Sequence, residues 1–450
     1  MPAPDVAALL SELERSEPAS AEHARSAIDW LTGGEPLETI TQLNVCEFLW
    51  YTLPCKVTGD RHAIARALGR LLRLGGLERY AELCSASTTV HILRVYARLG
   101  EEAGTAAYQS ALDATGVLPP DVPELRWSSI MGPEELGAHG ACSAALELAI
   151  VSGEIAPGPG GPDASAPPDE PARPDGPGAS TASAGPDGPG ASAIPAVPGA
   201  PPPSAEGRRR LTSRWLTTPR PELGGDNWLH RVQGERLNRW VLGRGTAWRE
   251  LAQPFEVRLH APIPAPREAH LDALRWLLEA GLRPGGVPLT QRHNLARSVL
   301  AESAWSGAEL AAAREVAQGQ MGALRQTGRR LVTTPAGERL LGDADLLWET
   351  AAAALLAPES GENGFRASAR EVALMLLADG APADRDHVAA VIDCAEWQTG
   401  EVDASLNELG KRLDAFGLRA GGRLTPAGRS AALAALRGHA LRPRQYVNLS

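Results

Sequence analysis

A long stretch rich in Pro, Gly, Ala and Ser, residues 156–207, constrains the fold of this 450-residue chain more than any other feature. The stretch contains no aromatic residue, and the heptapeptide PDGPGAS occurs in it twice, at 174–180 and at 186–192. Such a composition buries too little apolar surface to offset the entropy that is lost when a chain becomes ordered. We therefore expect a disordered linker that joins two folded halves.

Both halves are rich in Ala, Leu and Arg, which favour helices over strands. Aromatic residues make up only 4% of the chain, so the hydrophobic cores must consist mostly of aliphatic side chains. The predicted fold class is mainly α. It comprises a helical N-terminal domain, the disordered linker, and a C-terminal helical region with two winged-helix-like units that carry short β-hairpins.

Residues 1–155 are expected to form an acidic α-helical domain. Within 61–74 the apolar side chains recur at helical spacing, and two glycines follow as a stop signal. Further helices are predicted at 80–84, 88–99 and 133–151. The densest aromatic cluster, at 48–51, is interpreted as an anchor of the core rather than a ligand site, because aromatic rings bury large areas.

Residues 208–264 form a segment in which arginines and tryptophans are interleaved. One interpretation is that the indole rings stack on bases while the arginines neutralise phosphates. The other interpretation, which we favour, is a helix near 227–242 that packs its tryptophans inward and keeps its arginines in water.

Residues 265–357 are predicted to form the first winged-helix-like unit. Its expected elements are helices at 267–280, from Thr290 through Leu300 and at 308–325, followed by a strand at 328–334. Thr334 is then expected to cap the next helix, with Pro335 at the first helical position.

Residues 358–450 repeat this order as the second winged-helix-like unit. Its expected elements are helices at about 366–378, 386–398 and 402–416, a hairpin at 419–424, and a last helix that begins at Thr425-Pro426. The tetrapeptide Thr-Pro-Ala-Gly follows the strand-like segment in both units, at 334–337 and at 425–428. This recurrence suggests a duplication.

The C-terminal half also resembles a known group of proteins. The residues that carry the resemblance are the runs RRLVTTPAG at 329–337 and RLTPAGR at 423–429, together with Leu277 through Gly281, Pro288 through Thr290, Asp343 and Leu347-Trp348. They look like the C-terminal part of a plasmid open-reading-frame family that is common in actinobacteria and also occurs on insertion elements. The resemblance covers about 265–440. It implies a mobile-element or DNA-associated context and no catalytic residue. The hairpins also look like the wings of MarR-type regulators.

The charge of the chain is unevenly distributed around its net value of −10. Residues 1–207 carry 12 Lys and Arg against 27 Asp and Glu, whereas residues 208–339 carry 21 against 12. The middle of the chain is therefore the only part that we expect to face an anion. The alternative is that an acidic half and a basic half only keep each other in solution.

No sequence motif indicates catalysis or a bound cofactor. The chain lacks a GxxxxGK[ST] loop, a GxGxxG after a predicted strand, and the HExxH, CxxC and GxSxG patterns. Its cysteines and histidines are scattered, and a pair such as His139 with Cys142 falls short of the four ligands of a structural zinc site. We therefore expect no metal, no cofactor and a non-enzymatic role. An enzyme stays open, since sites assembled from distant residues leave no local signature.

Three observations favour a cytoplasmic protein without a membrane partner. The first residues lack the cationic and apolar regions of a signal peptide. The most apolar run, at 351–357, is too short to span a bilayer. The odd number of widely spread cysteines is typical of reduced thiols.

Two functions follow from these patterns. In the first, a regulatory protein contacts the phosphates of duplex DNA through its winged-helix-like units. In the second, the same units bind a protein partner, and the N-terminal domain serves as a tethered second arm. The helices at 308–325 and 402–416 carry acidic residues, which disfavour direct contacts of these helices with DNA bases in the first function. The candidate phosphate contacts are Arg314, Arg325, Arg329, Arg330, Arg339, Lys411, Arg412, Arg419, Arg423 and Arg429.

Overall fold

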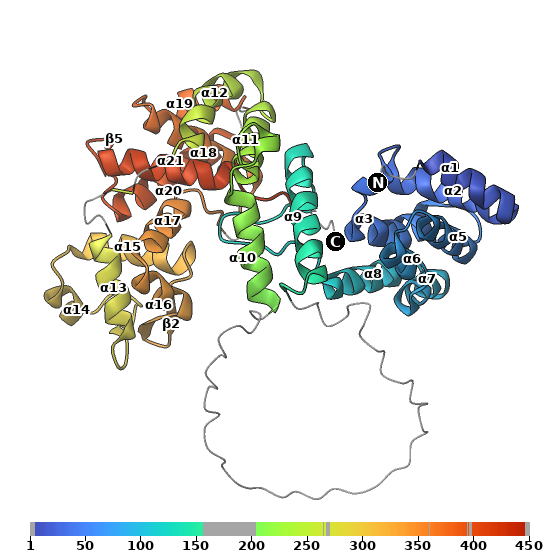
Figure 1. Ribbon diagram of the computed structural model, residues 1–450. Helices are drawn as coiled ribbons and strands as arrows, with labels where there is room; N and C mark the ends of the chain where they lie inside the picture. The colour runs from blue at the N-terminus through green and yellow to red at the C-terminus, as the bar shows by residue number, and fades with distance from the viewer. Residues whose placement is uncertain are drawn as a thin grey trace, which may run out of the picture. The chain divides into compact units, whose positions relative to one another are not determined.

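The structure, a computed structural model, describes residues 5–155, 204–263, 265–266, 271–359, 361–393, 395 and 398–445 (Figure 1). It confirms a mainly helical chain with small hairpin sheets. The predicted linker at 156–207 lies outside the described residues as far as 203, and its last four residues begin helix α10. The chain divides into two compact units. Unit 1 comprises Met1–Trp127 and Met131–Leu229, and unit 2 comprises Ser128–Ile130 and His230–Ser450.

Unit 1 is built from helices. They are α1 (Val6–Ser16), α2 (Pro18–Thr32), η1 (Leu37–Thr39), α3 (Gln42–Glu47), η2 (Phe48–Thr52), α4 (Leu53–Lys56), α5 (Arg61–Leu74), α6 (Glu78–Ser85), α7 (Ser87–Leu99), α8 (Glu101–Thr115), α9 (Pro133–Val151), α10 (Ser204–Thr217) and η3 (Pro221–Leu223). The bounds predicted for α5 and α9 are confirmed. Asp60 fixes the start of α5, because its carboxylate accepts hydrogen bonds from the backbone of His62 and Ala63.

The aromatic cluster at 48–51 lies in η2, a short π-helical turn, and largely anchors the core as predicted. Phe48 and Trp50 are buried. The Trp50 indole nitrogen donates to the Thr89 hydroxyl at 2.8 Å, and that hydroxyl donates to the Leu83 carbonyl. Tyr51 is the exception, since its ring reaches the surface.

Unit 2 contains the remaining helices and all the strands of the described residues. They are α11 (Trp228–Leu242), α12 (Thr246–His260), α13 (Asp272–Leu282), β1 (Val287–Pro288), α14 (Arg297–Glu302), α15 (Gly307–Gly319), β2 (Leu324–Thr327), β3 (Arg330–Thr333), α16 (Pro335–Gly342), α17 (Ala344–Ala354), α18 (Gly364–Ala378), α19 (Arg385–Val391), α20 (Thr399–Ala415), β4 (Arg419–Ala420), β5 (Arg423–Leu424) and α21 (Pro426–Ala440). The first two residues of α11 are counted with unit 1.

Three helices, a hairpin and a further helix follow one another twice in unit 2, and we call the two stretches the first and the second copy. In the first copy, α13, β1, α14 and α15 precede the β2–β3 hairpin, and β1 pairs antiparallel with β3 to give the sheet order β1-β3-β2. In the second copy, α18, α19 and α20 precede the β4–β5 hairpin, which forms a sheet of its own. The second hairpin is the shorter one, with two residues in each strand.

The first hairpin begins earlier in the chain than the sequence predicted. The helix expected at 308–325 ends as α15 at Gly319, because Gly322 adopts a left-handed φ of 58° and the chain turns there. Leu324, which was expected inside that helix, starts β2 instead. The single strand expected at 328–334 is β3 alone, with Gly328 at φ 60° in the turn before it.

Two other predicted helices of unit 2 are shorter than expected. In the helix predicted from Thr290, the first residues form a turn, in which the Thr290 amide donates to the Asn294 carbonyl at 2.8 Å and His293 has a φ of 60°. Only α14 is helical there. The helix predicted at 386–398 ends at Val391, ahead of Asp393 with its φ of 53°.

The repeated Thr-Pro-Ala-Gly tetrapeptide closes each hairpin in the same way. The Thr334 amide donates to the Ala323 carbonyl just before β2, and the Thr425 amide donates to the Leu418 carbonyl just before β4, both at 3.0 Å. Each threonine hydroxyl also caps the following helix by accepting from the glycine amide three residues on. A Cβ atom on Gly428 would lie 2.0 Å from the Leu418 carbonyl oxygen. The motif therefore requires glycine for close backbone approach.

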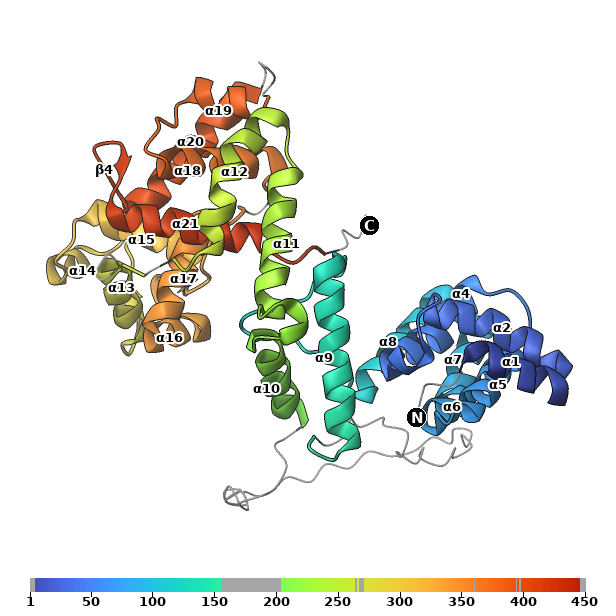
Figure 2. The same cartoon turned by 45° about the horizontal axis from the view of Figure 1, so that its top comes forward.

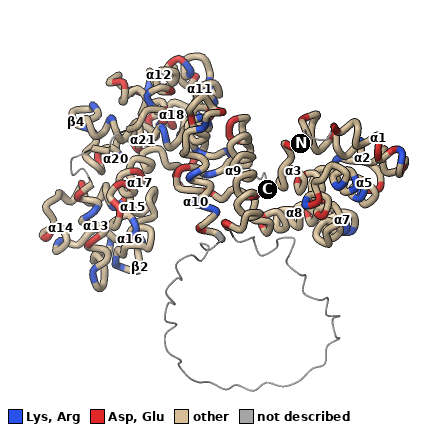
Figure 3. Tube along the Cα trace, in the orientation of Figure 1, with Lys and Arg blue, Asp and Glu red and all other residues tan. Residues whose placement is uncertain are grey.

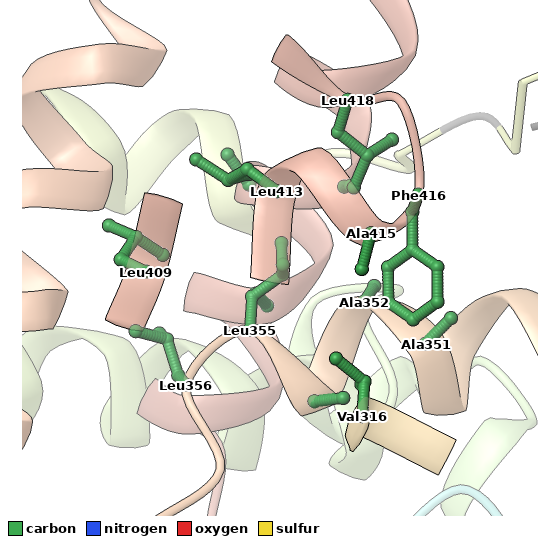
Figure 4. Close-up of a cluster of buried hydrophobic side chains, with 14 of the residues drawn as sticks. Val316, Ala351, Ala352, Leu355, Leu356, Leu409, Leu413, Ala415, Phe416 and Leu418 are labelled. Carbon is green, nitrogen blue, oxygen red and sulfur yellow. The ribbon is translucent and has the colours of Figure 1, made fainter. Parts of the chain in front are cut away.

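The two copies share one core rather than two. A single cluster of buried side chains extends from Leu237 to Ala440. α15 packs on α20 and α17 packs on α21, and Figure 4 shows Val316 and Leu355 of the first copy among Leu413 and Phe416 of the second. α12 packs on α18 and α21 (Figure 2).

The predicted domain limits at 208, 264 and 357 therefore do not mark separate bodies. α10 packs on α9 in unit 1, whereas α11 and α12 contribute buried side chains to the core of unit 2.

We expect the substitution Gly428→Ala to lower the free energy of unfolding by about 1–3 kcal/mol, because the added methyl group has to displace the Leu418 carbonyl. Gly438→Ala is the matched control, since it lies in the same helix with nothing within 4 Å of the added Cβ. That control should raise stability by up to about 1 kcal/mol, because alanine is the better helix former. Urea denaturation, monitored by circular dichroism, measures the stability of both variants. Equal effects of the two substitutions would contradict the close approach of Gly428 to the Leu418 carbonyl.

Candidate nucleic-acid interface

The β2–β3 hairpin presents a basic surface. Arg325, Arg329 and Arg330 are all exposed, and the sequence from 316 to 337 contains no acidic residue. Within the described residues, no ion pair involves any of these arginines. Basic residues colour the hairpin beside the β2 label in Figure 3. The local field of this hairpin is therefore positive, as the charge distribution along the sequence predicts.

Backbone carbonyls hold two of the predicted arginines of the first copy. Arg330 Nη1 donates to the Gly285 carbonyl, and this hydrogen bond connects the hairpin to the turn after α13. Arg314 Nη1 donates to the His293 carbonyl at 2.5 Å, and Nη2 donates to the Gln326 side chain at 3.3 Å. These acceptors are neutral, so both guanidinium groups keep an uncompensated charge.

Arg314 and Arg339 are weaker candidates than the three arginines of the hairpin. Arg314 is half-buried beside a cavity of about 460 Å³ between the 293–295 segment and α15, and burial lowers the pKa of its guanidinium. Arg339 is exposed on α16 next to Glu338, which lies on the same exposed surface.

The second hairpin is less basic than the first. Arg419 donates from Nε and Nη2 to the two carboxylate oxygens of Asp414, at 2.9 and 2.6 Å, and this carboxylate raises the pKa of Arg419. Lys411, Arg423 and Arg429 are exposed, and Arg429 also donates to the Leu424 carbonyl at 3.4 Å. Pairing with Asp414 removes most of the field that Arg419 was expected to provide.

The prediction that Arg412 contacts phosphate is wrong. Its side chain is fully buried, and Nη1 donates to the carbonyls of Ala354, Leu355 and Ala357 at 3.0, 3.3 and 2.6 Å. Its Nε donates to the Glu408 carboxylate at 2.9 Å. Arg412 therefore satisfies the carbonyls at the end of α17, and no ligand in solvent can reach it.

The exposed faces of α15 and α20 carry few cations. On α15 the exposed stripe contains Ala308, Ala311 and Glu315. On α20 the corresponding stripe contains Asn407, Lys411 and Asp414, again with Ala at its N-terminal end. Such faces are poorly suited to lie among phosphates in a major groove.

The Arg/Trp-rich segment contains the helix that was predicted near 227–242, which is α11. Trp240 is buried as expected, but so is Arg236, which was expected in water. Two arginines of this segment stack on indole rings of the same segment: Arg220 lies 3.5 Å from the Trp215 ring centroid and Arg244 lies 4.1 Å from that of Trp248. These rings are therefore already occupied and do not form an open stacking surface for bases.

The described residues contain no group of three or more His, Cys, Asp and Glu side chains that could hold a metal ion. None of the helices in the described ranges combines the length and the apolar character needed to cross a membrane. Cys394, the fifth cysteine of the sequence, lies outside the described residues.

Comparison of the chain with protein-family models, with curated proteins and with solved structures finds no match. The resemblance to a plasmid open-reading-frame family therefore stays a prediction.

We expect Arg412→Ala to lower the free energy of unfolding by about 3–5 kcal/mol, because it leaves the half-buried Glu408 carboxylate and several buried carbonyls without a donor. Lys411→Ala changes the preceding, exposed residue and should leave stability nearly unchanged. Urea denaturation of the two variants measures the difference. If Lys411→Ala proved the more damaging, the assignment of Arg412 to the core would be refuted.

Proposed function

We propose that unit 2 binds duplex DNA through the β2–β3 hairpin, with the hairpin arginines on backbone phosphates. The observation that carries the proposal is an exposed hairpin with three arginines and no acidic residue in the 22-residue sequence around it. In this proposal the first copy acts as a winged helix-turn-helix unit: α14 and α15 are its helix pair, and β2–β3 is its wing.

The order of elements supports this assignment. β1 pairs with β3, so the hairpin is joined to the helices through a three-stranded sheet rather than projecting alone. The bond from Arg330 to the Gly285 carbonyl holds the hairpin against the turn after α13. A wing that is fixed in this way loses little conformational entropy when it meets a duplex.

The charges favour contacts to phosphates over contacts to bases. The exposed stripe of α15 offers Glu315 and small side chains, and it carries no exposed cation to neutralise the phosphates that flank a major groove. Contacts from arginines to phosphates position a protein on the duplex but carry no sequence information. We therefore expect binding that depends strongly on salt and weakly on sequence.

The second candidate is a protein partner on the same helical faces. It is favoured by the exposed acidic side chains Glu309 and Glu315 of α15, whereas Asp403 and Asp414 of α20 already pair with Arg385 and Arg419. A carboxylate-bearing face repels DNA but can pair with a basic partner. Co-purification of the intact protein from its native cell, with and without nuclease, separates the two: a complex that survives nuclease treatment supports the protein partner.

We expect the triple substitution of Arg325, Arg329 and Arg330 to Gln to weaken binding to a mixed-sequence duplex and to flatten its salt dependence. Each phosphate contact contributes about −0.9 to the slope of log K against log salt, so the slope should become shallower by about 2–3. Fluorescence anisotropy of the full chain with a labelled duplex at several salt concentrations measures this.

The matched control substitutes Arg209, Arg210 and Arg214 to Gln. These three arginines are exposed on α10 in unit 1, so the control removes the same charge from another surface. It should leave the slope close to that of the unsubstituted chain. The proposal would be refuted if the unsubstituted chain did not bind the duplex at low salt, or if both triple variants changed duplex binding equally.

A further inference from the structure

Unit 2 holds a second cluster of arginines, on elements that do not belong to the hairpins. A cavity of about 230 Å³ opens between the end of α11 and the chain that follows α21. Five arginines line it: Arg236, Arg239, Arg244, Arg442 and Arg444. We call this cavity the arginine pocket.

Indole rings fix the orientation of one arginine of the pocket. The Arg244 guanidinium lies between two tryptophans, 4.9 Å from the ring centroid of Trp240 and 4.1 Å from that of Trp248. Trp240 itself lines the pocket. The Arg244 Nε is buried and has no hydrogen-bond partner within the described residues. A guanidinium held in this way is preorganised, so it loses little side-chain entropy on binding an anion.

A network of backbone contacts fixes the segment that carries the other arginines. Arg236 is buried, and its Nη1 donates to the Leu441 carbonyl at 2.7 Å. The Arg444 amide donates to the Ser128 hydroxyl at 3.0 Å, and the Ser129 amide donates to the Arg444 carbonyl at 2.7 Å. These bonds hold the chain at both Leu441 and Arg444, which places Arg442 and Arg444 at the pocket although both side chains are exposed.

Glu371 is a buried carboxylate that pairs with Arg244. Glu371 accepts from Arg244 and from the Trp240 indole nitrogen, the latter at 2.6 Å, and its other oxygen lies 3.4 Å from His439 Nε2. Arg442 and Arg444 place two further, exposed positive charges at the pocket. Burial also lowers the pKa of Arg244, because its charged form lacks part of its solvation. A bound anion would supply it.

We propose that the arginine pocket binds a phosphoryl group. Guanidinium groups pair with phosphate oxygens through planar forks, and a phosphoryl group offers more acceptor sites than a carboxylate. The cavity is smaller than the roughly 300–1,000 Å³ that drug-sized ligands occupy, so it fits a phosphate or pyrophosphate group rather than a whole nucleotide. The bearer of that group is either a small phosphorylated molecule or the backbone of a nucleic acid.

The test is calorimetric titration of the full chain with pyrophosphate at low ionic strength. We expect one site in unit 2, and the double substitution Arg442→Gln with Arg444→Gln should weaken binding by about tenfold or more, given the strength of charged hydrogen bonds. Both side chains are exposed, so the variant should fold. The control Arg297→Gln with Arg292→Gln removes the same charge from exposed positions that do not line the pocket, and it should bind pyrophosphate normally.

Absence of binding at millimolar pyrophosphate, or equal binding by the double variant and the unsubstituted chain, would overturn the proposal. A second arm identifies the bearer of the phosphoryl group. If the double variant also binds a labelled duplex less tightly, the phosphoryl group belongs to DNA. If duplex binding is unchanged, it belongs to a small molecule. The hairpin triple variant should retain pyrophosphate binding, so this inference and the proposed DNA contact can fail independently.

Discussion

The arrangement of unit 2 depends on a buried guanidinium. Arg412 of α20 bonds to three carbonyls at the end of α17, and so it joins the last helix of the first copy to the third helix of the second. A cation is favoured at a helix C-terminus, where the unpaired carbonyls concentrate negative charge. A second buried arginine, Arg370, donates to the same Ala357 carbonyl and to Glu362. Both arginines lie buried in the shared core, so the two copies form one folded body.

The packing of the two copies on each other limits how much of α15 and α20 is exposed to solvent. Because α15 packs on α20, each third helix has one face in the shared core and only a narrow stripe in solvent. The stripes carry few cations, whereas the first hairpin exposes three arginines. The first hairpin and the arginine pocket are therefore the two parts of unit 2 that we propose as anion-binding surfaces. At both places the backbone that carries the arginines is fixed by hydrogen bonds.

Besides those in surface ion pairs, the arginines of the described residues have three distinct roles. Arg370 and Arg412 are buried and satisfy carbonyls and carboxylates. Arg220 and Arg244 lie on indole rings, where a delocalised and weakly hydrated cation is favoured. Arg325 and Arg329 remain exposed. A count of positive charge along the sequence treats the three roles alike, which is why the basic character of residues 208–339 overstates the surface that faces solvent.

The sequence by itself determined the local features of this protein. Apolar spacing and caps gave the bounds of α5 and α9, and the repeated tetrapeptide located both hairpin-closing turns, because these features depend on residues within a few positions of one another. The start of the first hairpin was missed, since Gly322 can end a helix or continue it, and only the pairing of the following strand β2 with β3 decides.

The tertiary structure alone decided which basic residues face solvent. Lys411 and Arg412 are neighbours in sequence, yet one is exposed and the other is fully buried, because successive residues of a helix point to different sides and the partner helix selects the side. Similarly, the arginine pocket joins residues from 236 to 244 with residues 442 and 444. No local pattern could reveal that site, because the contact between those segments exists only once the core of unit 2 has formed.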